Sequence, residues 1–253
     1  MTSVKVRNTI IGEGIPKICV PIVGITNNDI IAEAKSLKNT PVDVVEWRVD
    51  WFEHGDDLEK VLLVLQELRP ILGNLPLLMT FRTSKEGGQK DIEPEEYAHL
   101  IIVAAESGYV DMVDVEIFIG DEIVKRIINA AHAVNVKVVA SNHDFHKTPK
   151  KEDIISRLCK MQDLGADIPK IAVMPQSKKD VLTLLTATEE MTTEHANRPI
   201  ITMSMSGTGV ISRLCGELFG SALTFGSVEK VSAPGQMEVN DLFTILQLFH
   251  NAL

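Results

Sequence analysis

Short apolar runs alternate with longer amphipathic segments along the chain. The runs have the length of β-strands, and glycine, proline, asparagine or aspartate residues bound them. They are Ile18–Ile22, Val44–Val49, Pro76–Phe81, Val110–Ile117, Lys137–Ser141, Ile168–Met174, Ile200–Met205 and Ala222–Phe225. Because a helical segment follows each run, the pattern predicts eight consecutive strand–helix units.

The helical segments carry start and stop signals. Asp57 precedes an amphipathic segment that Gly73 ends, and Pro94 lies in the first turn of the next one. Ser177 and Asp180 have the spacing of a capping box, with aspartate in place of the usual glutamate. These signals place helices between the apolar runs.

Eight repeated strand–helix units are typical of the α/β class and of a closed (β/α)8 barrel, the TIM barrel. An open doubly wound sheet is the alternative, but the sequence has no glycine-rich dinucleotide-binding turn. Val4–Ile11 precedes the first barrel strand and is expected to form a β-hairpin that covers the bottom of the barrel. Since no linker or low-complexity tract interrupts the chain, residues 1–253 are predicted to form one domain.

The charge balance limits the classes of partner. Lys and Arg number 25 and Asp and Glu number 35, so the formal net charge is −10. Such an acidic chain is poorly suited to bind nucleic acid or an anionic membrane. Residues 1–14 lack the apolar stretch of a signal peptide, and no apolar run approaches the ~20 residues of a membrane span. We therefore expect a cytoplasmic protein.

The cysteines indicate neither a metal site nor a disulfide framework. Cys19, Cys159 and Cys215 are odd in number and far apart, and none belongs to a CxxC or Cys/His cluster. This usage fits a reducing compartment.

Polar residues within the apolar runs are informative, because helices cover the outside of barrel strands and side chains fill the inside. In the second run, Val45 and Trp47 share one face, whereas Glu46 and Arg48 share the other. With Val45 and Trp47 against the helices, Glu46 and Arg48 point into the barrel near its mouth. A purely structural ion pair is the alternative.

Lys170 and His143 are the candidates for reactive groups. Lys170 alternates with Ile171 in the sixth run, so its side chain is expected inside the barrel. Burial disfavours a charged ammonium, and a neutral amine is a nucleophile suited to imine formation with a ketone. A lysine that is salt-bridged to Glu46 is the alternative. His143 ends the fifth strand, where an imidazole is placed for acid–base work or for a structural hydrogen bond.

Further polar residues follow other strands. Arg82 opens a long loop that contains Glu86, and Arg213 follows the glycine-rich turn after the seventh strand. The loop after the eighth strand contains Ser232–Gln236, which is small, polar and able to act as a lid. Solvated loop residues are the alternative. All of these positions lie at the carboxyl ends of strands, and several inward arginines indicate a small anionic, oxygen-rich substrate.

Together these residues resemble the type I 3-dehydroquinate dehydratase family, over essentially the whole chain. The resemblance is carried by six segments in the same order: Glu46–Asp50, Thr80–Arg82 with Lys85–Gly88, Ser141–Phe145, Gly165–Ala172, Gly209–Leu214 and Ser232–Gln236. It implies dehydration of 3-dehydroquinate to 3-dehydroshikimate in the shikimate pathway of aromatic amino acid biosynthesis.

The resemblance also implies roles for individual residues. Lys170 would form a Schiff base with the substrate ketone, His143 would act as general base and acid, and Glu86 would orient His143. Arg213 would hold the substrate carboxylate, with Ser232 and Gln236 closing over it. The other substrate-binding positions of the resemblance are Glu46, Arg48 and Arg82, at the ring hydroxyls, and Trp47. The resemblance implies a homodimer and implies no metal or organic cofactor.

Three other functions are compatible with a polar barrel mouth. A class I aldolase would share the buried lysine. A metal-dependent isomerase would use Asp114 and Glu116, with Glu46 and His143, to bind Mg²⁺ or Mn²⁺. A non-catalytic barrel would bind a sugar acid or a protein partner without turnover.

Overall fold

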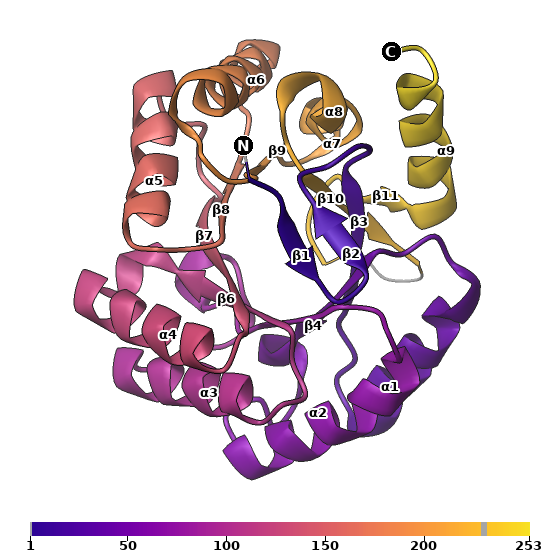
Figure 1. Cartoon of the computed structure of the whole chain (residues 1–253), viewed down its shortest axis with the longest axis vertical. Coiled ribbons are helices and arrows are strands. Elements are labelled where there is room, and N and C mark those ends of the chain that lie inside the picture. The colour runs from indigo at the N-terminus through magenta and orange to yellow at the C-terminus, as the bar shows by residue number, and fades with distance from the viewer. Residues whose placement is uncertain (1, 229–231) are drawn as a thin grey trace.

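The computed structural model of the chain describes residues 2–228 and 232–253. Within these residues, parallel strands curl into a barrel and helices surround it (Figure 1). The strands are β1 (Val4–Val6), β2 (Thr9–Ile11), β3 (Lys17–Ile22), β4 (Val44–Arg48), β5 (Leu77–Thr80), β6 (Met112–Glu116), β7 (Lys137–Asp144), β8 (Ile168–Val173), β9 (Ile201–Ser204), β10 (Leu223–Ser227) and β11 (Met237–Glu238). The helices are α1 (Asn27–Ser36), α2 (Leu58–Leu72), α3 (Pro94–Glu106), α4 (Asp121–Ala133), α5 (Lys151–Asp163), α6 (Lys178–Glu190), α7 (Ile211–Leu214), α8 (Gly216–Phe219) and α9 (Val239–His250).

The predicted (β/α)8 barrel is confirmed. Strands β3 to β9 pair in parallel in chain order, β10 pairs in parallel with β3, and β11 pairs with β10 beyond the barrel. The two ends of the barrel sheet meet where the Ala222 N–H donates to the carbonyl of Ile200 at 2.8 Å. Each of the eight predicted runs overlaps one barrel strand. Strand β7 continues past Ser141 to Asp144, which brings His143 into the sheet itself.

The predicted helix signals are also present. The side chain of Asp57 accepts the Lys60 N–H at the start of α2, and Ser177 and Asp180 form a reciprocal capping box at the start of α6. After β9 the chain makes only two short helices, α7 and α8, in place of one long helix. No helix in the described part of the chain is long and apolar enough to cross a membrane.

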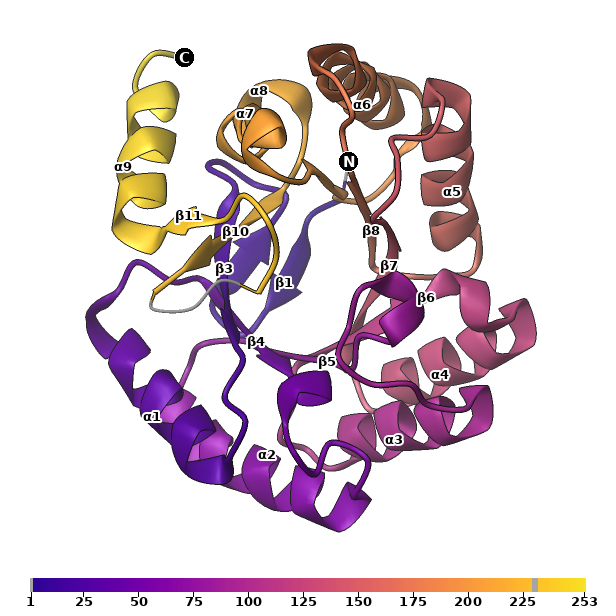
Figure 2. The same cartoon turned by 180° about the vertical axis from the view of Figure 1, so that it is seen from behind.

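The N-terminal hairpin covers the bottom of the barrel, as predicted. Strands β1 and β2 pair antiparallel across that opening (Figure 1). Val4, Val6 and Ile11 pack against inward side chains near the amino-terminal ends of the barrel strands, including Val44 and Ile168. The opposite opening, at the carboxyl ends of the strands, is ringed by the loops that follow them (Figure 2).

The alternation of side chains along the barrel strands matches the sequence pattern. Val45 and Trp47 lie in the outer core between the strands and the helices, whereas Val44 lies in the inner cluster. Lys170 likewise lies on the same face as Ala172, which belongs to the inner cluster. The inside of the barrel therefore changes along its axis, from apolar above the hairpin to charged at the mouth.

Candidate active site

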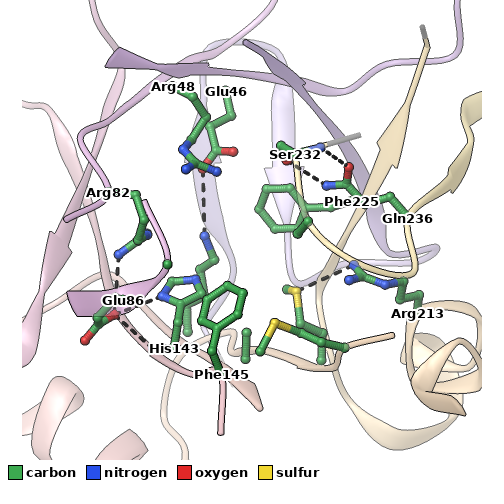
Figure 3. A pocket seen from close by; sticks show the side chains of 16 residues that line it. Glu46, Arg48, Arg82, Glu86, His143, Phe145, Arg213, Phe225, Ser232 and Gln236 are labelled. Atoms are coloured by element: carbon green, nitrogen blue, oxygen red, sulfur yellow. Dashed lines mark hydrogen bonds and ion pairs between the residues drawn. The ribbon is translucent and has the colours of Figure 1, made fainter. Parts of the chain in front are cut away.

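A pocket opens at the carboxyl ends of the barrel strands, and polar and apolar side chains share its wall (Figure 3). Its lining residues are Glu46, Arg48, Arg82, Glu86, Gly87, His143, Phe145, Lys170, Ala172, Met203, Met205, Arg213, Phe225, Ser232, Ala233 and Gln236. Every predicted site residue except Trp47 is among them. They come from loops and strands spread over most of the chain, so they meet only when the sheet closes.

Lys170 lies on the wall of the pocket and is only 3% exposed. Its Nζ atom is 3.3 Å from Oδ2 of Asp114 and 3.8 Å from Oε1 of Glu46. The Phe225 ring covers another side, with its centroid 4.6 Å from Nζ. The amine is therefore held by two carboxylates and an aromatic ring while it remains in contact with the pocket.

His143 is tied to Glu86. Its Nδ1 lies 2.9 Å from Oε2 of Glu86, and its backbone N–H donates to the same oxygen at 2.9 Å. Burial lowers the pKa of His143 well below its ordinary 6.5, and the nearby cations Arg82, Lys170 and Arg48 lower it further. The imidazole is thus neutral near pH 7. When Nδ1–H donates to Glu86, the lone pair of Nε2 is free to accept a proton.

Glu86 lies in the loop that Arg82 opens, and it is buried. Burial raises its pKa to about 7, against the lowering effect of Arg82. The Asn142 side-chain amide donates to its other oxygen, Oε1, at 3.0 Å. The loop packs closely at Gly87, where a Cβ atom would collide with the Phe145 ring, and its φ of +84° also suits glycine.

Arg82 is the centre of a buried ion network. Its Nη1 donates to Oε1 of Glu116 and to Oγ of Ser141, each at 2.9 Å, and its Nη2 donates to Oδ1 of Asp114 at 2.8 Å. Burial alone would lower the pKa of Arg82, but the surrounding carboxylates, Asp114 first, raise it well above its ordinary value. With both Nη atoms bonded inside the protein, Arg82 is better placed to organise the pocket than to bind a hydroxyl.

Arg48 is held by Asp50, whose role sequence reasoning missed. The carboxylate of Asp50 accepts from Nε and Nη2 of Arg48, both at 2.8 Å. It also accepts the backbone N–H of Arg82 at 3.2 Å and of Gln89 at 3.1 Å. One buried carboxylate therefore fixes Arg48 and both ends of the loop that carries Glu86.

Arg213 is the least compensated cation of the site. It is 1% exposed, its Nη2 donates to the carbonyl of Pro234 at 3.2 Å, and its Nε has no hydrogen-bond partner in the described part of the chain. Burial lowers its pKa to about 10, so it remains charged at neutral pH. A buried cation with free donor capacity is suited to bind a carboxylate.

The loop after β10 lies over the pocket beside Arg213 (Figure 3). Ser232 and Gln236 bond to each other, since the Ser232 N–H donates to Oε1 at 2.8 Å and Nε2 donates to Oγ at 2.9 Å. The Ser206 N–H donates to the carbonyl of Pro234 at 3.1 Å. Gly235 has a φ of +82° and packs against the Ser206 backbone too closely for a Cβ atom.

Trp47 corrects one expectation. It is fully buried in the outer core, its ring centroid is 6.1 Å from that of Phe52, and it does not line the pocket. Glu46 and Arg48, its neighbours in the chain, occupy the inward face, so strand alternation directs Trp47 toward the helices. It supports the strand from the helix side, away from the pocket wall.

Sequence reasoning also missed the apolar wall of the pocket, formed by Phe145, Met203, Met205 and Phe225. Apolar residues of a strand have no distinguishing mark in the sequence. Met203 lies in β9 and Met205 follows the end of that strand, and their spacing of two residues was the one signal that both could face inward.

The carboxylates considered as metal ligands are engaged elsewhere. Asp114 bonds to Arg82, Ser141 and Lys170, and Glu116 accepts from Arg82 and from both the N–H and the hydroxyl of Thr83. Arg82, Lys170 and the Ser141 hydrogen bond hold the pKa of Asp114 below its usual value despite its burial. In residues 2–228 and 232–253, no group of three or more His, Cys, Asp or Glu side chains is arranged to hold a metal ion.

The fold and the site define a (β/α)8-barrel enzyme whose mouth holds a buried lysine, a neutral histidine and an arginine with no carboxylate partner among the described residues. Residues 18–252 match the family model of type I 3-dehydroquinase. A 3-dehydroquinate dehydratase of Clostridioides difficile strain 630 is 58% identical over 250 residues, covering 99% of this chain and 98% of that protein. That of Salmonella typhimurium LT2 is 55% identical over 252 residues and covers all of both chains.

A solved structure agrees with this assignment. The type I 3-dehydroquinate dehydratase from Clostridium difficile superposes with a TM-score of 0.97 at 57% identity, over 100% of this chain and 99% of that one. The chain belongs to the type I 3-dehydroquinate dehydratase family, whose members are hydro-lyases.

Proposed function

We propose that this chain dehydrates 3-dehydroquinate to 3-dehydroshikimate through a Schiff base on Lys170, in the shikimate pathway of aromatic amino acid biosynthesis. The observation that carries the proposal is that the buried amine of Lys170 shares one pocket with neutral His143 and with Arg213, which has no carboxylate partner among the described residues. A ketone, an acidic C–H and a carboxylate on one small molecule would each meet a suitable group.

Imine formation is the first step. The lone pair of the Lys170 amine attacks the C3 carbonyl and a C–N bond forms. The carbonyl oxygen leaves as water after it gains one proton from the attacking nitrogen and one from solvent. The nitrogen of the resulting protonated imine carries the positive charge. Asp114 and Glu46 are within 3.3 and 3.8 Å of Nζ and would balance that charge.

His143 would then remove a proton from C2. The protonated imine withdraws electrons, so this C–H becomes acidic enough for an imidazole. The C–H electron pair moves toward the imine nitrogen and forms an enamine. Its return expels the C1 hydroxyl, which receives the proton from His143 and leaves as water. Hydrolysis of the new imine releases the product and restores the Lys170 amine.

Substrate binding would use the cations around the pocket. Arg213 is expected to take the substrate carboxylate, because its charge has no carboxylate partner among the described residues. Ser232 and Gln236 would exchange their mutual hydrogen bonds for bonds to the substrate as the loop closes. Glu46 and Arg48 would contact the ring hydroxyls, while Arg82 would hold the carboxylates around them. All of these steps use groups of the protein only.

A relative supports covalent chemistry at this site. The Clostridium difficile protein was solved with covalent modified comenic acid. We extend to this chain the capacity for a covalent bond in the pocket and assign that bond to Lys170, the amine that lines it.

The proposal includes a cytoplasmic location and a homodimer. The three cysteines are free, which suits a reducing compartment. The homodimer follows from the family resemblance. Light scattering coupled to size-exclusion chromatography would test it, because a mass near 27.9 kDa would contradict a dimer.

Borohydride reduction tests the mechanism directly. The protein is reduced with and without 3-dehydroquinate, then analysed by intact mass and peptide mapping. A substrate-dependent adduct on Lys170, absent from Lys170→Ala and Lys170→Arg, is the expected result, since a guanidinium cannot form this imine. Turnover without any trapped adduct in the folded wild type would contradict the Schiff base. Addition of a chelator distinguishes a metal-dependent reaction, which it would abolish.

A further inference from the structure

Phe225 is the aromatic residue of the pocket that lies against the Lys170 amine. It comes from β10, faces inward, and is 4% exposed at the edge of the pocket. Lys170 Nζ lies over its ring, 4.6 Å from the centroid. The face of an aromatic ring carries negative charge density and attracts a cation within about 6 Å. The ring is therefore positioned to act on the charge of this nitrogen.

The two carboxylates near Nζ also serve other partners. Asp114 directs Oδ2 to Lys170, but its Oδ1 accepts from Arg82 and Ser141, so its charge is shared. Glu46 is farther, at 3.8 Å, and accepts a hydrogen bond from Thr80. Compensation by carboxylates is thus partial, and the aromatic ring lies close to the nitrogen as well.

An aromatic face and a carboxylate differ in one chemical respect. A carboxylate stabilises a protonated imine but also offers a lone pair that can take its proton, which would discharge the electron sink. A phenyl ring has no basic lone pair. It therefore stabilises the cation without deprotonating it.

On the basis of the proposed function, we infer that Phe225 is a catalytic residue whose ring face stabilises the protonated imine on Lys170. The ring contacts the nitrogen before the ketone arrives and remains beside it in the covalent intermediate. It favours the two steps that create positive charge on this nitrogen, imine formation and collapse of the enamine with loss of water. Phe225 thus has an electrostatic role beyond its apolar bulk.

The chain offers a matched control. Phe145 lines the same pocket, and in the described residues no cation lies over its ring. Substitution of Phe145 changes the apolar wall without removing a ring from Lys170. A comparison of the two positions therefore separates loss of the ring charge from loss of apolar contact.

The experiment measures the rate of adduct formation with 3-dehydroquinate by rapid borohydride quench and intact mass. The variants are Phe225→Leu and replacement of Phe225 by mono-, di- and trifluorophenylalanine, each matched at position 145. Fluorine preserves the shape of the ring and withdraws its facial charge. Far-ultraviolet circular dichroism and thermal unfolding confirm that each variant is folded.

We expect Phe225→Leu to slow adduct formation by about two- to thirtyfold, the range of a cation–π contact, and each added fluorine at position 225 to slow it further. At position 145, the rate of adduct formation should not fall in step with the number of fluorines. Adduct formation that is insensitive to fluorine at position 225 would overturn the inference, even if Phe225→Leu is slow, because the ring would then act by bulk alone. Absence of any adduct in the wild type would instead overturn the proposed function.

Discussion

His143 and Glu86 are joined twice through a single oxygen atom. Oε2 of Glu86 lies 2.9 Å from both the Nδ1 atom and the backbone nitrogen of His143. The two contacts fix the imidazole ring relative to its own main chain, so Nε2 has a defined direction into the pocket. Because burial and nearby cations also keep the ring neutral, the geometry and the charge state of His143 both suit a base.

Removal of the imidazole should stop the reaction after the covalent step. His143→Ala retains Lys170 and Arg213, so the imine still forms, but proton removal and imine hydrolysis lose their acid–base group. We expect kcat to fall by about 10²- to 10⁴-fold and the Lys170 adduct to accumulate during turnover. Borohydride trapping with intact mass measures the adduct. Wild-type turnover in His143→Ala, with no accumulated adduct, would make His143 a structural residue.

Glu86 should make stability depend on pH. Its pKa is raised from 4.5 to about 7 in the folded protein, so folding favours the protonated carboxyl. Its contribution to stability is therefore complete below about pH 4.5 and is lost as the pH rises to about 7. Relative to Glu86→Gln, the wild type should lose roughly 1–3 kcal/mol of unfolding free energy across this window.

Urea denaturation of both proteins between pH 4 and pH 8 measures this difference. Toward pH 8 the difference should level off, because the carboxylate is then largely ionised in the folded protein as well as in the unfolded one. Glu96→Gln on the exposed surface of α3 is the control and should change little across the same window. A difference between wild type and Glu86→Gln that is flat from pH 4 to pH 8 would contradict the raised pKa.

Arg213→Gln should weaken binding and strengthen the fold. Loss of a charge-assisted bond to the substrate carboxylate, worth about 1.5–3 kcal/mol, should raise KM by roughly 10- to 100-fold with a smaller change in kcat. Removal of a buried charge that has no carboxylate partner in the described part of the chain should also raise the melting temperature. Steady-state kinetics and calorimetry measure the two effects. An unchanged KM would remove Arg213 from the binding site, and Arg126→Gln on the surface of α4 serves as the control.

Asp50→Asn should disturb two parts of the pocket at once. The carboxylate accepts four hydrogen bonds, and the amide nitrogen of asparagine would face donors that it cannot satisfy. We expect a loss of about 2–4 kcal/mol of stability and a higher KM, as Arg48 and the Glu86 loop lose their shared anchor. Asp56→Asn, at an 80% exposed side chain, is the control. Equal kinetics and stability in both variants would contradict this role.

The sequence by itself determined the class of the fold and which charged residues of the strands enter the barrel. Alternation of side chains along a strand is a local property, so it placed Glu46, Arg48 and Lys170 inside the barrel before any contact was known. It also directed Trp47 outward, and the structure agrees with alternation where the motif resemblance alone had suggested substrate binding.

Only the tertiary structure decided which of these groups meet. Asp50, Arg82 and Gln89 are held together by bonds between different loops, and the Phe225 ring reaches Lys170 because β10 and β8 lie on one closed barrel. Apolar residues have no mark in the sequence that separates a pocket wall from ordinary core. The protonation states of His143 and Glu86 depend on burial and on charges from distant segments, which are set by packing and not by neighbours in the chain.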